Sequence, residues 1–155
     1  HRRVPGHGAA GIEGLNGLPV VVDAGVHRAD ERDVVYHAAQ VRQQLGELAP
    51  VIPVRGNVDG GWARLLPERR RLDLGGVAVL ILHDRALVGR EPFTPAKRAE
   101  RIVVFGHSHQ PLAEKRKGVL WFNPGSAGPR RFNLPVSVGR LVIEDGRVRH
   151  HLLTL

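Results

Sequence analysis

The sequence predicts a single α/β domain in which two β-sheets pack together with helices outside. Continuous apolar runs at Val77–Leu82 and Ile102–Phe105 are typical of strands buried on both faces. One earlier segment has helical apolar spacing, and the chain ends in an alternating hairpin pattern. The length of 155 residues suits one domain, which we take as residues 1–155.

The helix is expected over about residues 38–48, where Val41, Leu45 and Leu48 share one face and Pro50 ends the segment. The expected strands are Val20–Val22, Val51–Val54, Val77–Leu82, Ile102–Phe105 and Val119–Phe122, followed by a hairpin of Val136–Glu144 and Arg147–Leu153 around an Asp145-Gly146 turn.

The composition limits the chemistry. The chain has no cysteine, so disulfides and thiolate metal sites are excluded, and a metal must bind through His, Asp, Glu, Asn or water. No apolar run approaches the roughly 20 residues of a membrane span, so we expect no membrane association and a cytoplasmic protein. The formal net charge is +8, but only 5% of the residues are aromatic, too few for a base-stacking platform. Nucleic-acid binding is therefore the minor alternative to an anionic small substrate.

Ligand-type side chains follow three of the predicted strands. Asn57 follows the strand at 51–54, His83 follows the strand at 77–82, and His107 and His109 follow the strand at 102–105. Ligands of open α/β sheets bind beyond the carboxyl ends of the strands. A lone histidine at a strand end is more often a hydrogen-bonded structural residue, but three such strand ends together indicate a metal site for Mn, Fe, Ni or Zn.

These residues belong to four motifs that occur in a fixed order. The motifs are Gly56-Asn57-Val58-Asp59, Leu82-His83, Gly106-His107-Ser108-His109-Gln110-Pro111 and Asn123-Pro124-Gly125-Ser126. In this order and spacing the chain, over about residues 38–155, resembles the small bacterial and archaeal phosphodiesterases of the calcineurin-like metallophosphoesterase superfamily. The resemblance implies a two-sheet sandwich flanked by helices, two divalent metal ions and a bridging water that attacks a phosphate ester.

The resemblance also implies roles for single residues. Asn57, His83 and His107 would bind one metal ion, and His109 would bind the other. Asn57 and His107 would position metal and phosphate, and they are the expected catalytic residues. Arg130 follows the Asn-Pro-Gly-Ser loop and would contact the substrate phosphate. The expected cofactors are two divalent ions (Mn, Ni, Fe, Zn or Mg), and the expected substrate is a small phosphate ester.

The beginning of the chain departs from the family pattern. Family members open with a strand ending in Asp-x-His and a second strand ending in Gly-Asp, and neither motif is intact here. The carboxylate that bridges the two metals is expected from Asp23, at a strand end, or Asp33, at nearly the family's distance from Asn57. The chain starts with His1, so we expect the first strand to be missing; truncation, a sequence or reading-frame error, and divergence all fit. Without a shared anion the second metal should bind weakly.

The motifs and their departures from the family pattern are consistent with two functions from different classes. The first is a metal-dependent phosphodiesterase or phosphatase. The alternative is a non-catalytic protein-interaction module of the same fold, as in the similar retromer subunit, or a decayed copy of an enzyme. A missing first strand would leave a sheet edge unpaired beside the metal site, and such an edge favours homo-oligomers.

Overall fold

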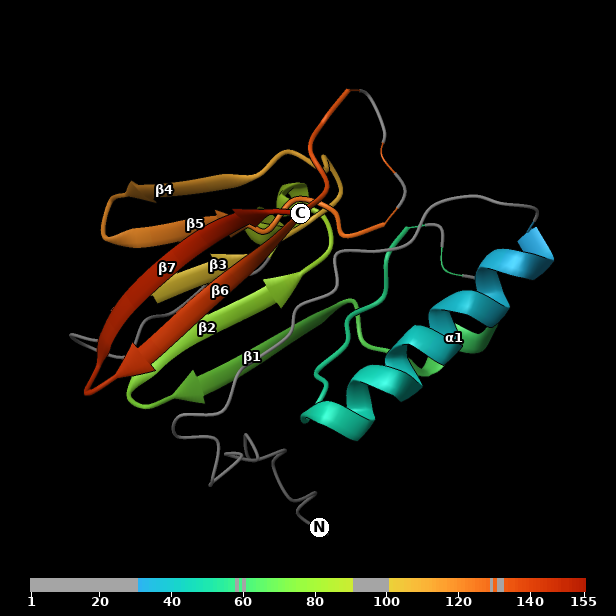
Figure 1. Cartoon of the computed structure of the whole chain (residues 1–155). Helices are drawn as coiled ribbons and strands as arrows, with labels where there is room; N and C mark the ends of the chain where they lie inside the picture. Colours follow the sequence, from blue (N-terminus) through green and yellow to red (C-terminus); the bar gives the residue numbers. More distant parts are fainter. Residues whose placement is uncertain (1–30, 58, 60, 91–100, 129, 131–132) are drawn as a thin grey trace, which may run out of the picture.

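A five-stranded mixed sheet forms the centre of the molecule (Figure 1). The computed structural model describes residues 31–57, 59, 61–90, 101–128, 130 and 133–155. The strands of this sheet are β1 (Arg69–Leu74), β2 (Val77–Leu82), β3 (Arg101–Val104), β4 (Leu112–Arg116) and β5 (Val119–Asn123). Their spatial order is β1-β2-β3-β5-β4. The remaining strands, β6 (Ser137–Glu144) and β7 (Arg147–Thr154), form a separate antiparallel hairpin.

The three inner strands β2, β3 and β5 run parallel, so their carboxyl ends meet at one edge of the sheet. Every residue of β2 except Ala78 is buried, as are the last three residues of β3. This burial on both faces explains the continuous apolar runs and confirms that prediction. The outer strands β1 and β4 pair antiparallel with their neighbours, β2 and β5.

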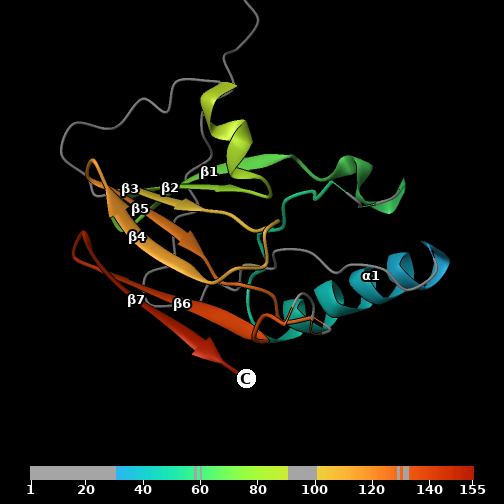
Figure 2. The ribbon, with the colours of Figure 1, turned by 90° about the horizontal axis from the view of Figure 1, so that it is seen from above.

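The hairpin lies under the central sheet as a second layer (Figure 2). One face of the central sheet packs toward it, with Val79, Ile81, Ile102, Val104 and Phe122 at the centre of the cluster. The hairpin contributes partly buried side chains to the same cluster, at Leu141, Ile143 and Val148. The fully buried residues of this cluster thus lie on β2, β3 and β5, and the hairpin covers them.

The opposite face of the central sheet has a smaller apolar cluster. Leu80, Leu82, Val103 and Phe105 are buried there, and the 3-10 helix η2 (Arg85–Arg90) packs against them through Leu87 and Val88. A second 3-10 helix, η1 (Gly61–Leu65), precedes β1.

The α-helix α1 (Glu31–Leu48) begins earlier than predicted and ends where predicted. It lies to one side of the two layers in both views, rather than on a sheet face (Figures 1 and 2). Val41 and Leu48 are exposed and Leu45 is half-buried. The shared apolar face of this helix thus contributes little to the core among the described residues. No helix in the described part of the chain is long and apolar enough to cross a membrane.

The prediction of a strand at Val51–Val54 is wrong. Residue 51 makes only an isolated bridge and residues 52–56 are irregular, although Ile52 and Val54 pack against the inter-sheet cluster. Pro53 has no N–H to donate to a ladder, and the apolar run is half-buried without forming a strand. The strand predicted at 20–22, and our expectations for the start of the chain, lie outside the described residues.

Candidate metal centre

The loops that follow β2 and β3 meet at the carboxyl edge of the sheet. His83 comes directly after β2, and Gly106 and His107 follow β3. The backbone N–H of Gly106 donates a hydrogen bond to the carbonyl oxygen of His83, at 2.9 Å. The two loops are therefore tied together where the parallel strands end.

Three potential ligand atoms converge at this point. Nε2 of His83 lies 2.8 Å from Oδ1 of Asn57 and 3.3 Å from Nδ1 of His107. The two imidazole rings are nearly perpendicular, at 82°, with centroids 5.2 Å apart. His83 is buried at 5% exposure, while Asn57 and His107 are exposed. The cluster is thus buried on the side of His83 and open to solvent on the side of Asn57 and His107.

The spacing of these atoms fits the neutral ligands of one divalent ion. With metal–ligand distances of about 2.0–2.1 Å, adjacent ligand atoms lie about 3.3–3.4 Å apart in a tetrahedral centre and about 2.8–3.0 Å apart in an octahedral one. The observed separations are 2.8 Å and 3.3 Å. Neutral imidazole carries one ring hydrogen, so Nε2 of His83 has at most one hydrogen to share with both neighbours. A cation would accept the lone pairs of Asn57, His83 and His107 together.

A tight turn brings Asn57 to the cluster. The N–H of Gly56 donates to Oδ2 of Asp59 at 2.6 Å, which closes the turn around Asn57. A Cβ atom at position 56 would lie 3.3 Å from the ring of His83 and 3.2 Å from Asp59 Oδ2. Glycine therefore lets this backbone lie close against the His83 ring.

The loop after β3 has an unusual backbone. His107 and His109 both adopt positive φ, at 65° and 57°. Such a conformation costs a non-glycine residue about 1–2 kcal/mol, so the surrounding structure must hold it. The N–H of Ser108 donates to the carbonyl oxygen of Gly106 at 2.8 Å, across His107. His107 is therefore the central residue of a γ-turn of the rare positive-φ kind.

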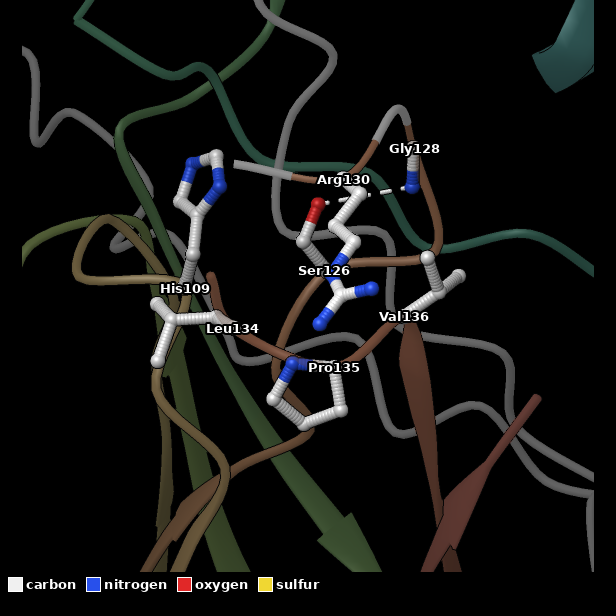
Figure 3. A pocket seen from close by; sticks show the side chains of 7 residues that line it. All are labelled: His109, Ser126, Gly128, Arg130, Leu134, Pro135 and Val136. Carbon is white, nitrogen blue, oxygen red and sulfur yellow. Dashed lines mark hydrogen bonds between the residues drawn. The ribbon is translucent and has the colours of Figure 1, made fainter. Parts of the chain in front are cut away.

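His109 and Arg130 line a small cavity next to the Asn-Pro-Gly-Ser loop (Figure 3). His109 is buried at 5% exposure, and Arg130 is exposed. The cavity has a volume of about 10 Å³, room for roughly one water molecule. Ser126, Gly128, Leu134, Pro135 and Val136 complete its lining. The structure thus groups His109 with Arg130, and groups Asn57 with His83 and His107.

The described residues do not identify the carboxylate that was predicted to bridge the two metal ions. Within the described residues, no group of three or more His, Cys, Asp or Glu side chains is placed to hold a metal ion. Asp33 lies in the first turn of α1, and Asp23 lies outside the described residues. The bridging carboxylate therefore stays a prediction.

Asn123, the last residue of β5, is a site residue whose individual role was not predicted from the sequence. Its side chain is fully buried beside the loop that carries His107, and donates to Gly106 O at 3.1 Å. The sequence did contain one indication of such a role. An amide side chain stands at the end of an apolar run, as the first residue of the Asn-Pro-Gly-Ser motif.

Comparison with known proteins decides the family. Residues 20–146 match the sequence profile of the calcineurin-like phosphoesterase superfamily domain. The chain belongs to this family. Among curated phosphoesterases, phosphodiesterase YfcE of Escherichia coli K12 is 34% identical over 120 residues, which cover 68% of this chain and 60% of YfcE. The chain thus spans 60% of the length of this relative.

Two solved structures have the same fold as this chain. The structure of the E. coli phosphoesterase Yfce gives a TM-score of 0.56 at 21% identity, covering 88% of this chain and 99% of that one. Vps29 of Entamoeba histolytica, solved in complex with Zn²⁺, gives a TM-score of 0.59 at 20% identity, with coverage of 88% and 99%. These likenesses confirm the predicted mixed α/β fold.

Proposed function

We propose that this chain is a metal-dependent phosphoesterase that hydrolyses phosphodiester or phosphomonoester bonds. The observation that supports it most is that Asn57 Oδ1 and His107 Nδ1 both lie close to His83 Nε2, at 2.8 Å and 3.3 Å. These are neutral donors of the kind that borderline divalent ions prefer, and they lie at the carboxyl ends of parallel strands.

In this proposal the residues of the chain have separate tasks. Asn57, His83 and His107 hold one divalent ion, and His109 binds a second. The exposed guanidinium of Arg130 binds oxygens of the substrate phosphate, for which its planar fork of N–H donors is suited. When bound, divalent ions in such a centre polarise a phosphoryl oxygen and acidify water. The exposed side of the cluster, formed by Asn57 and His107, lets a phosphate ester approach from solvent.

The first test measures metal content after dialysis against Mn²⁺ or Ni²⁺ followed by removal of free ion. We expect His107→Ala to lose most of the bound metal, because one of three converging ligands is gone. His151→Ala is the matched control, since His151 is an exposed histidine on β7, remote in sequence from the three motifs. Equal metal content in the wild type and His107→Ala would contradict the assignment.

The second test measures hydrolysis of bis-p-nitrophenyl phosphate and p-nitrophenyl phosphate with added Mn²⁺. Metal-dependent turnover that His107→Ala lowers by about 10²-fold or more would support an enzyme.

A non-catalytic protein-interaction module is the second candidate. It is favoured by the lack of a carboxylate grouped with His83 and His107 within the described residues. The shared fold with Vps29 is compatible with it. Metal binding without turnover of either substrate would favour this module over the enzyme.

A further inference from the structure

The amide side chain of Asn123 bridges two loops. Nδ2 donates to the carbonyl oxygen of Gly106 at 3.1 Å and to Oγ of Ser108 at 3.0 Å. Oδ1 accepts a hydrogen bond from the N–H of Gly125 at 2.9 Å. The side chain is 0% exposed, so both amide hydrogens and the amide oxygen have protein partners.

The residues that Nδ2 contacts are the two on either side of His107. Gly106 and Ser108 also form the γ-turn hydrogen bond of 2.8 Å that encloses His107. Asn123 therefore clamps both ends of a turn that a non-glycine residue adopts only under restraint. The direction of the His107 ring depends on this turn, because φ of 65° fixes how its Cβ leaves the backbone.

We propose that Asn123 is a positioning residue for the metal centre. It acts through the γ-turn to hold Nδ1 of His107 at 3.3 Å from Nε2 of His83, so that both imidazoles face one cation before it binds. Outer partners of this kind orient metal ligands. The link to metal affinity rests on the proposed function; the restraint on His107 does not.

The main variant is Asn123→Asp. It keeps the size of the side chain and an oxygen that accepts from Gly125 N–H, but it turns a carboxylate oxygen toward the carbonyl of Gly106. Ser137→Ala is the matched control. Ser137 is also buried, at 1% exposure, and its hydroxyl donates to Pro124 O at 3.0 Å in the neighbouring loop, without a bond to the loop of His107.

Two readouts separate positioning from a general structural role. Both readouts are taken by NMR on the metal-free Asn123→Asp protein. The contact between the rings of His83 and His107 should weaken. Hydrogen exchange of the Ser108 amide should become at least about tenfold faster. Core amides of β2 and β3 should keep their protection. Affinity for Co²⁺ or Mn²⁺ should fall about 10–100-fold, while Ser137→Ala stays within about twofold of the wild type.

Unchanged ring contact and Ser108 exchange in a folded Asn123→Asp protein would overturn the proposal. If Asn123→Asp does not fold, Ser108→Ala replaces it, because Ser108 is exposed and its hydroxyl is one partner of Nδ2. A His107 ring unaffected in Ser108→Ala would then count against the clamp. A wild type that binds no metal would refute the proposed function, and the metal-free NMR comparison would still decide the role of Asn123.

Discussion

Replacing Gly125 with alanine should destabilise the protein by about 2–5 kcal/mol, which combines two separate effects. Gly125 has φ of +86°, a conformation that costs an L-residue about 1–2 kcal/mol. An added Cβ would also lie 1.9 Å from Oγ of Ser137 and 3.0 Å from Cγ of Pro111. Because Ser137 is buried, relief requires the loop and β6 to shift, an overpacking cost of about 1–3 kcal/mol.

Gly146→Ala isolates the backbone part of this cost. Gly146 lies in the β6–β7 turn with φ of +72°, and a Cβ there would meet nothing within 4 Å. Its replacement should cost only the conformational strain of about 1–2 kcal/mol. The free energy of unfolding of each variant is measured by urea titration, followed by tryptophan fluorescence, to which Trp121 on β5 contributes.

Ser137→Ala provides the test of the collision itself. Alone it removes the hydrogen bond to Pro124 O, which should cost about 1 kcal/mol. Combined with Gly125→Ala it removes the atom at 1.9 Å, so the double variant should be more stable than the sum of the single losses by about 0.5–3 kcal/mol. The steric reasoning is refuted if Gly125→Ala costs no more than Gly146→Ala, or if the two losses simply add.

Two further predictions concern the packing of the layers and a surface ion pair. Phe122→Ala should lower the free energy of unfolding by about 3–5 kcal/mol, measured by thermal unfolding, because Phe122 is 2% exposed and lies in the inter-sheet cluster. A loss below about 1 kcal/mol would mean that the packing of the hairpin does not depend on Phe122. Arg149→Ala should change stability by less than about 0.5 kcal/mol, because the Arg149–Glu144 pair at 2.5 Å is 66% and 62% exposed. A larger loss for Arg149→Ala that persists in 1 M salt would show that this arginine contributes by packing.

The central strands could be predicted from the sequence because burial on both faces leaves a continuous apolar run. The edge strands β1 and β4 were missed, since they carry charged clusters such as Arg69-Arg70-Arg71 and Glu114-Lys115-Arg116. Charged edge strands discourage pairing between molecules, and the same charges hide the alternating pattern. The error at Val51–Val54 has the opposite cause, because an apolar run reports burial and not strand pairing.

The meeting of His83 and His107 could also be predicted, because each follows a parallel strand and such strands end at one edge. Asn57 joins them without a preceding strand, through a turn closed by Asp59. The clamp by Asn123 could not be inferred, because it depends on the direction of a buried amide relative to a loop 15–17 residues away in the chain.

The charge of the converging ligands bears on how the centre would work. In the proposed centre Asn57, His83 and His107 would all be neutral donors, so a divalent ion held by them alone would keep its full charge. Concentrated positive charge at an open site attracts anions, and in the proposed function Arg130 would add to that charge. If no carboxylate joins the cluster, the phosphate ester would itself supply the missing negative ligand, and ion and substrate would each strengthen the binding of the other. If Asp23 or Asp33 joins it, the ion would bind well alone and this coupling would weaken. The dependence of metal affinity on phosphate thus follows from which acidic residue, if any, completes the centre.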